Sequence, residues 1–254
     1  MSTLVFLVGI IIGSFLNVCI CRIPKEGSLV FPGSHCPKCS TPLQWFDLIP
    51  IISFILGGGK CRYCGKSISS QYLLVELITG FIFTILYYYF GFNIDFIFYS
   101  FIFSILIIIA FIDIDHQIIP NRLVLIILLG TLLYKYIHYL LYSRSLYLIN
   151  SIMGLIISSL FFLIIVILSK GGMGGGDVKL IGALGFILGI PKIILNIFLS
   201  FLIGGVVSVL LLAFNIKGRK DPIPFGPFIV LGFIITFFAG DRIINWYILN
   251  CFLR

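Results

Sequence analysis

Four of the seven cysteines form two C-x-x-C pairs, separated by 21 residues: Cys36, Cys39, Cys61 and Cys64. Each pair offers two thiolates from one tight turn, and this spacing is typical of a tetrahedral four-cysteine zinc site. Four thiolates leave no open coordination position, so such a zinc ion would be structural. His35 could act as an additional or substitute ligand but is not required. The alternative is two independent redox-active or unliganded pairs.

A second chemically capable segment, residues 111–121, lies at the end of a long apolar run and contains Asp113 and Asp115. A carboxylate at a helix centre costs about 2.5–3.5 kcal/mol on membrane-insertion scales, so an acid beside a membrane helix is a functional candidate. Side chains two positions apart in a helix point in directions roughly 200° apart around its axis. At most one of the two acids should therefore point into a helix bundle. The alternative places both acids in a hydrated loop as helix-end charges.

A third segment is glycine-rich: five of the residues 171–176 are glycine, and Asp177 follows them. Such a run allows very close approach of the backbone, and Asp177 would begin a short helix whose dipole favours a carboxylate. The G-K-[ST] sequence of a phosphate-binding loop is missing. A flexible loop with an N-capping aspartate is the alternative.

Asp113 and Asp177 together indicate one shared site. Both are expected at the cytoplasmic ends of membrane spans, so they can meet at one depth of a helix bundle. Two carboxylates in contact share a proton. One can then act as general base on water while the protonated partner polarises a carbonyl group, which is the chemistry of an aspartic protease.

The composition of the chain indicates which kind of structure holds these residues in place. Of the 254 residues, 60% are hydrophobic and 10% are charged, against roughly 25% charged in soluble domains, and the mean hydropathy is +1.20. We therefore expect an all-α polytopic membrane protein, and the composition excludes a soluble enzyme or a nucleic-acid partner. Apolar runs predict eight spans: 2–20, 73–90, 96–112, 122–142, 147–169, 178–190, 193–215 and 226–249.

The distribution of basic residues predicts the topology. With the N-terminus outside, 12 of the 17 Lys and Arg residues fall in the cytoplasmic segments 21–71, 113–122, 170–179 and 216–225, as the positive-inside rule requires. We predict three parts: a first transmembrane helix (1–20), a cytoplasmic tetracysteine domain (21–71) and a transmembrane peptidase domain (72–254). Residues 49–56 are an apolar interruption of the second part, too short to span, that would form a small core or touch the membrane surface.

Several motifs, in this order, resemble those of the type IV prepilin peptidases, intramembrane aspartic proteases of the GxGD type. The motifs are Gly13-Ser14-Phe15-Leu16-Asn17-Val18 with Arg22-Ile23-Pro24, the cysteine tetrad, Ser69 to Glu76 with Thr79-Gly80, Asp113 with Pro120, and Gly174-x-Gly176-Asp177 with Lys179-Leu180. The resemblance covers nearly the whole chain.

The resemblance implies that Asp113 and Asp177 are the catalytic pair and that Asp115 is a neighbour. The family cleaves the leader of prepilins and pseudopilins after a glycine at the cytoplasmic membrane face. Its bifunctional members, which carry the cysteine tetrad, then N-methylate the new N-terminal residue, usually Phe, with S-adenosylmethionine. The implied location is the bacterial cytoplasmic (inner) membrane, with a zinc domain in the cytoplasm.

Glu76 is a possible methylation residue, because it is an acid at the membrane boundary beside the tetracysteine domain. It could orient the substrate amine or the charged centre of S-adenosylmethionine; alternatively it is only a helix-end charge. Two other functions stay open: a peptidase without methylation, and an ion-coupled small transporter with an aspartate relay. A transporter should show broken helices in matching halves, whereas the sequence has one glycine-broken position, at 171–176.

Overall fold

The computed structural model describes residues 1–142, 148–169, 172–218 and 221–252, and the regular secondary structure of this part of the chain is helical apart from two isolated β-bridges. Seven of its helices are long and apolar enough to cross a membrane. They are α1 (Ser2–Arg22), α3 (Gln71–Phe90), α4 (Ile94–His116), α5 (Asn121–Tyr142), α6 (Leu148–Leu168), α8 (Ile190–Ala213) and α9 (Gly226–Tyr247). The prediction of an all-α polytopic membrane protein is confirmed.

The sixth predicted span, residues 178–190, differs from the other seven. It forms α7 (Gly175–Leu188), whose 14 residues rise only about 21 Å, against a hydrocarbon thickness of about 30 Å. Glycine-rich backbone precedes it, and Gly189, with a φ of +74°, ends it before Pro191. Because α5, α6, α8 and α9 all contact α7, neighbouring helices cover it on several sides.

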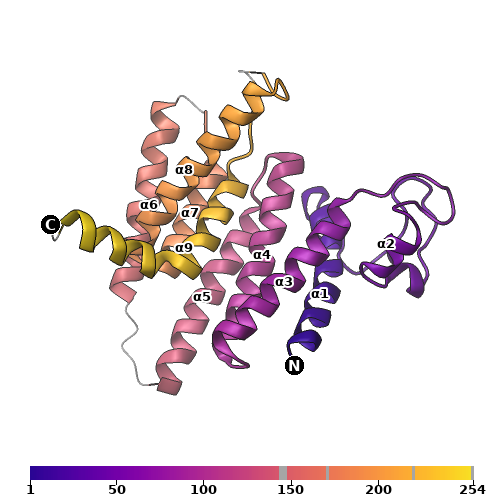
Figure 1. Ribbon diagram of the computed structural model, residues 1–254, viewed down its shortest axis with the longest axis horizontal. Coiled ribbons are helices and arrows are strands. Elements are labelled where there is room, and N and C mark those ends of the chain that lie inside the picture. Colours follow the sequence, from indigo (N-terminus) through magenta and orange to yellow (C-terminus); the bar gives the residue numbers. More distant parts are fainter. Residues whose placement is uncertain (143–147, 170–171, 219–220, 253–254) are drawn as a thin grey trace. The chain divides into compact units, whose positions relative to one another are not determined.

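The chain divides into two compact units, and unit 1 comprises Met1–Ile108. Here α1 and α3 lie side by side (Figure 1). A Cβ on Gly9 would lie 2.8 Å from Cα of Gly80, and the side-chain amide of Asn17 donates to the carbonyl of Tyr72 at 3.0 Å. Small residues therefore allow a close antiparallel helix pair, as is common in membranes.

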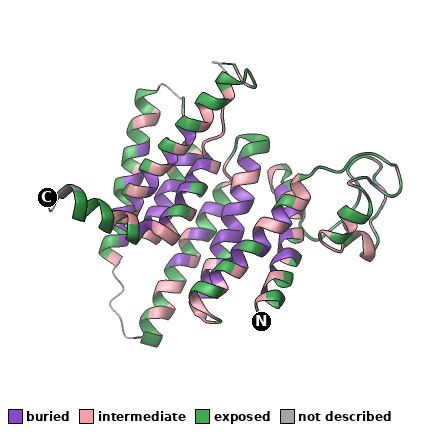
Figure 2. Ribbon diagram, in the orientation of Figure 1, coloured by how far each residue is buried: buried purple, intermediate pink, exposed green. Residues whose placement is uncertain are grey.

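Residues 23–70, which join α1 to α3, form a mostly exposed segment that we call the knuckle module (Figure 2). It contains the short helices η1 (Ile23–Lys25), η2 (Trp45–Leu48) and α2 (Ile52–Leu56). The apolar interruption predicted at 49–56 thus supplies α2, which packs on η2. The predicted three-part domain division stays a prediction.

Unit 2 comprises Ile109–Arg254 and contains the end of α4 and helices α5 to α9. Its core includes Leu180 and Ile181 of α7, Phe162 of α6 and Phe233 of α9, all fully buried. Helices α6 and α7 meet at two glycines, because a side chain on Gly154 would overlap the carbonyl oxygen of Gly185. This close packing joins the C-terminal half of α7 to α6.

Candidate active site and cysteine cluster

Asp113 lies in the last turn of α4 and is only 5% exposed. Asp115, two residues later, is exposed. The two acids therefore face different directions, as the helical spacing predicts. Only Asp113 is placed where a carboxylate is withdrawn from solvent.

The buried carboxylate of Asp113 receives a hydrogen bond from the start of another helix. The backbone N–H of Gly226, the first residue of α9, donates to Oδ2 of Asp113 at 2.8 Å. A Cβ on Gly226 would lie 2.7 Å from the same oxygen, so a side chain there would displace the carboxylate. Sequence reasoning missed this partner, although the Gly226-Pro227 pair is a signal for a helix start.

Asp177 is the third residue of α7 and is 6% exposed. Its Oδ1 is buried and has no hydrogen-bond partner among the described residues. Asp113 and Asp177, 64 residues apart in the sequence, thus both lie buried in unit 2, at the end of α4 and at the start of α7. Their pairing as catalytic residues stays a prediction.

The glycines before Asp177 differ in what surrounds them. A Cβ on Gly176 would lie 2.9 Å from Cβ of Ile119, whereas a Cβ on Gly175 would meet nothing within 4 Å. A Cβ on Gly174 would lie 3.4 Å from Oδ2 of Asp177. Gly176 is therefore required for close packing against the segment that follows α4. The earlier residues Lys170 and Gly171 of this motif lie outside the described residues.

Two further hydrogen bonds join the segments around the acids. The ammonium group of Lys179 in α7 donates to Oδ1 of Asn121, the first residue of α5, at 2.9 Å. The side-chain amide of Gln117 donates to the carbonyl of Pro222 at 3.4 Å. These bonds tie the polypeptide after α4 to α7 and to the segment before α9, so the surroundings of both acids are fixed from two sides.

The positions of the acids also explain how their charge is tolerated. Asp177 lies in the first turn of α7, and Asp113 accepts from the first N–H of α9. The start of a helix carries a partial positive charge and unpaired N–H groups, both of which stabilise an anion. The start of one helix therefore stabilises each of the two buried acids.

The cysteine tetrad forms the second candidate site, in unit 1. The Sγ atoms of all four cysteines lie within 4.8 Å of one another. Tetrahedral bonds of 2.3 Å to one zinc ion require sulfur–sulfur separations of about 3.8 Å. The cluster is thus compact enough for a single metal ion. Of the four, Cys36 and Cys61 are buried and Cys39 and Cys64 are half-buried.

Each C-x-x-C pair is closed by the same turn. Ser40 and Gly65, the residues after the second cysteine of each pair, have φ values of +57° and +69°. Their backbone N–H groups donate to the carbonyls of Cys36 and Cys61, both at 2.8 Å. The turn requires a left-handed residue, a conformation that glycine adopts at no steric cost, and Gly65 occupies this place after Cys64.

Side-chain hydrogen bonds lower the pKa of one cysteine and link the two C-x-x-C pairs. A hydrogen bond with the hydroxyl of Thr41 lowers the pKa of the Cys39 thiol to about 6, which favours the thiolate that binds metals. The ammonium group of Lys38, in the first pair, donates to the carbonyl of Ser67, beyond the second, at 2.8 Å. His35 is exposed, and its Nδ1 lies 3.0 Å from the carbonyl of Gly33.

Glu76, the possible methylation residue, is buried in α3 and 7% exposed. Its Oε2 accepts a hydrogen bond from the backbone N–H of Ile51 at 2.8 Å. A Cβ on Gly13 of α1 would lie 2.7 Å from the Cα of Glu76. Glu76 therefore joins the knuckle module to the α1–α3 pair, and a role toward a cofactor stays a prediction.

Comparison with known proteins agrees with this arrangement. Residues 7–90 match the bacterial peptidase A24 N-terminal domain, and residues 100–209, which include both buried aspartates, match the type IV leader peptidase family. A prepilin leader peptidase/N-methyltransferase of Bacillus subtilis is 35% identical over 98% of both chains. The corresponding enzyme of Pseudomonas aeruginosa is 33% identical over 95% of this chain and 91% of its own.

A third relative of the same name, from Aeromonas hydrophila, is 32% identical over 98% of this chain and 94% of its own. No solved structure matches the chain. The helical fold with seven candidate membrane spans and these matches define a membrane peptidase. The chain belongs to the type IV leader peptidase family.

Proposed function

We propose that this protein is a membrane endopeptidase that removes the leader of type IV prepilins or pseudopilins after a glycine. It then N-methylates the new N-terminal residue, usually Phe. The observation that carries the proposal is the buried pair of Asp113 and Asp177 within the region that matches the leader peptidases. The names of the relatives support both activities, and the four-cysteine cluster is the feature expected of the bifunctional members.

The proposed chemistry is direct attack of water on the scissile peptide carbonyl. Two neighbouring buried carboxylates hold one proton between them. The ionised aspartate takes a proton from water, and the protonated one donates a hydrogen bond to the carbonyl oxygen. The tetrahedral intermediate then breaks its C–N bond as the nitrogen is protonated, which releases the leader carboxylate and the new amine. The unpaired Oδ1 of Asp177 is free to take part in this exchange.

We place the protein in the bacterial cytoplasmic membrane, with the N-terminus outside and the knuckle module in the cytoplasm. The module carries five basic residues and two acids, which favours the cytoplasmic side. The prepilin leader is cut at this face in the family. On this proposal the dyad and the module both act at the same membrane surface.

We further propose that the four cysteines hold a structural zinc ion. Its chemistry is that of a fixed tetrahedral cross-link, and the two left-handed turns at Ser40 and Gly65 shape the cage. A segment as exposed as the knuckle module has little core of its own, so metal binding would contribute much of its folding free energy.

S-adenosylmethionine is the methyl donor that the proposed second activity requires, and it supplies a methyl group from a charged sulfonium. One hollow of unit 1 does not suit this charged group, because its lining is largely apolar. A hollow of about 350 Å³ between α1 and α3 is lined largely by apolar side chains, including Phe6 and Phe81. The carboxylate of Glu76 is already engaged by Ile51. We therefore assign no residue to this cofactor and derive no step through it.

The proposal as a whole is tested by incubating the purified protein with a prepilin in lipid or detergent, with and without S-adenosylmethionine. Mass spectrometry should show loss of the leader after glycine, and one added methyl group only when the cofactor is present. Cleavage without methylation would leave the peptidase and remove the transferase. A zinc-loaded, folded protein that leaves several prepilins uncut would contradict the proposal and favour the transporter.

The glycine loop offers a matched pair of variants. We expect Gly176→Ala to lower kcat/KM for leader cleavage by about 10²-fold, because its Cβ would press on Ile119 and displace the start of α7, and small misplacements at an active site have effects of this size. Gly175→Ala, whose Cβ meets nothing within 4 Å, should stay within about twofold of the wild type. Equal effects of the two variants would refute this account of the loop.

The metal site is tested by Cys39→Ser, with Cys21→Ser as control because Cys21 is exposed and outside the cluster. Metal analysis of the purified wild type should give about one zinc per chain. We expect Cys39→Ser to lose it and to expose the knuckle module to limited proteolysis, whereas Cys21→Ser keeps both properties. Full zinc occupancy in Cys39→Ser would contradict the four-cysteine site.

A further inference from the structure

Helix α2 of the knuckle module begins beside the spanning helices rather than beyond their ends. The N–H of Ile51, directly before α2, donates to Glu76, which lies five residues, or about 8 Å, inside α3. On α1 the same level is marked by Gly13, about 13 Å before the helix ends at Arg22. The start of α2 is therefore held beside the spanning helices, below the level at which α1 ends.

The backbone at Ile51, where α2 begins, is strained. Ile51 has a φ of +62°, a conformation that is rare for a β-branched residue. Such strain persists only where the surroundings determine it, and here the hydrogen bond to the buried carboxylate of Glu76 does so. The entry to α2 is a fixed feature of unit 1.

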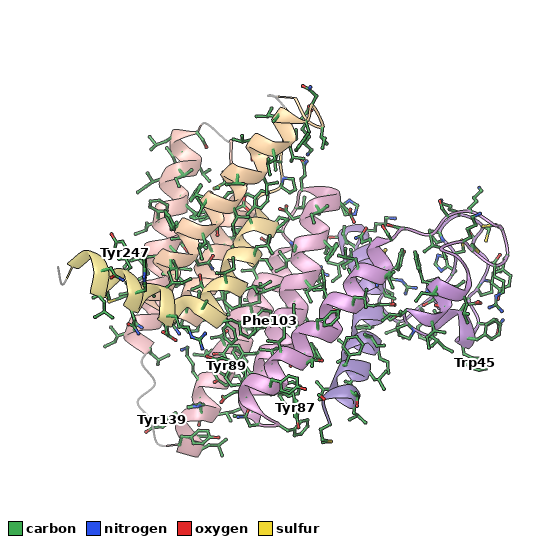
Figure 3. The ribbon with its side chains drawn as sticks, in the orientation of Figure 1. Trp45, Tyr87, Tyr89, Phe103, Tyr139 and Tyr247 are labelled. Atoms are coloured by element: carbon green, nitrogen blue, oxygen red, sulfur yellow. The ribbon has the colours of Figure 1, made fainter. Side chains whose placement is uncertain are left out.

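The side chains that follow are apolar and uncovered. In α2, Ile52, Ile55 and Leu56 are 54%, 65% and 77% exposed. On η2, which packs against α2, Trp45 is 76% exposed; Figure 3 labels it on the knuckle module. Contiguous exposed apolar groups mark a binding surface, and Trp is enriched at the membrane–water boundary.

We propose that α2 and Trp45 form an interfacial anchor that inserts into the lipid leaflet where α1 ends and α3 begins. Lipid is favoured over a protein partner because Ile51, at the start of the anchor, is hydrogen-bonded to Glu76 within α3, a candidate membrane-spanning helix. The rest of the module carries an excess of basic residues that suits anionic headgroups: Lys25, Lys38, Lys60, Arg62 and Lys66. The anchor does not depend on the proposed catalytic chemistry.

The chain has two tryptophans, Trp45 and Trp246, so Trp246→Phe leaves Trp45 as the sole reporter. This full-length variant is reconstituted in vesicles of phosphatidylcholine and phosphatidylglycerol, with bromine either near the headgroup or deep in the acyl chain. We expect bromine near the headgroup to quench Trp45 emission by about twofold or more, as at other interfacial tryptophans. Aqueous acrylamide should quench it weakly. The converse variant, Trp45→Phe, gives the reference for a tryptophan on a spanning helix.

Trp45 emission that acrylamide quenches fully and neither brominated lipid changes would overturn the proposal. Trp45 that no brominated lipid quenches, and that becomes protected from acrylamide only after a prepilin is added, would also overturn it, in favour of a peptide-docking surface. In a second variant, Ile55→Glu with Leu56→Glu in the Trp246→Phe background, the headgroup-level quenching should fall at least about twofold, because charged groups leave the apolar boundary. Unchanged quenching in this zinc-loaded variant would show that α2 is not the anchor.

Discussion

Burial of two carboxylates among apolar helices is the constraint on which unit 2 depends. An isolated ionised carboxylate in such surroundings is strongly unfavourable, and a neighbouring acid adds repulsion. The fold compensates by directing two helix starts at the pair: Asp177 sits in the first turn of α7, and the first N–H of α9 donates to Asp113.

The glycines of the chain serve the same constraint in different ways. At Gly226 a side chain would occupy the place of the Asp113 carboxylate, and at Gly176 it would collide with Ile119. The knuckle module solves a similar problem with sulfur: left-handed turns at Ser40 and Gly65 bring four thiols together in a segment with little core. In unit 2 the absence of a side chain, and in the knuckle module a left-handed backbone conformation, allows the reactive groups to take their places.

Local patterns in the sequence were sufficient to predict the long helices and several features of the two candidate sites. Hydropathy predicts the long helices, helical spacing separates buried Asp113 from exposed Asp115, and C-x-x-C spacing predicts the thiol cluster. Contacts between distant segments were not predictable: Gly226 lies 113 residues from Asp113, and Ile51 lies 25 residues from Glu76. Each of these partners is a backbone N–H, which every residue except proline possesses, so residue type carries no signal for it. The length of α7 was ambiguous because glycines precede its apolar run and Gly189 and Pro191 end it.

The central claim is that Asp113 and Asp177 act as one catalytic pair, and kinetics of leader cleavage by Asp113→Asn, Asp177→Asn and Asp115→Asn test it most directly. These changes keep the side-chain shape and remove one titratable group. The account predicts that Asp113→Asn and Asp177→Asn each lose at least about 10²-fold in kcat, the contribution expected of general acid–base catalysis, while exposed Asp115→Asn keeps substantial activity. Cleavage at the wild-type rate by either Asp113→Asn or Asp177→Asn, in a folded protein, would contradict it.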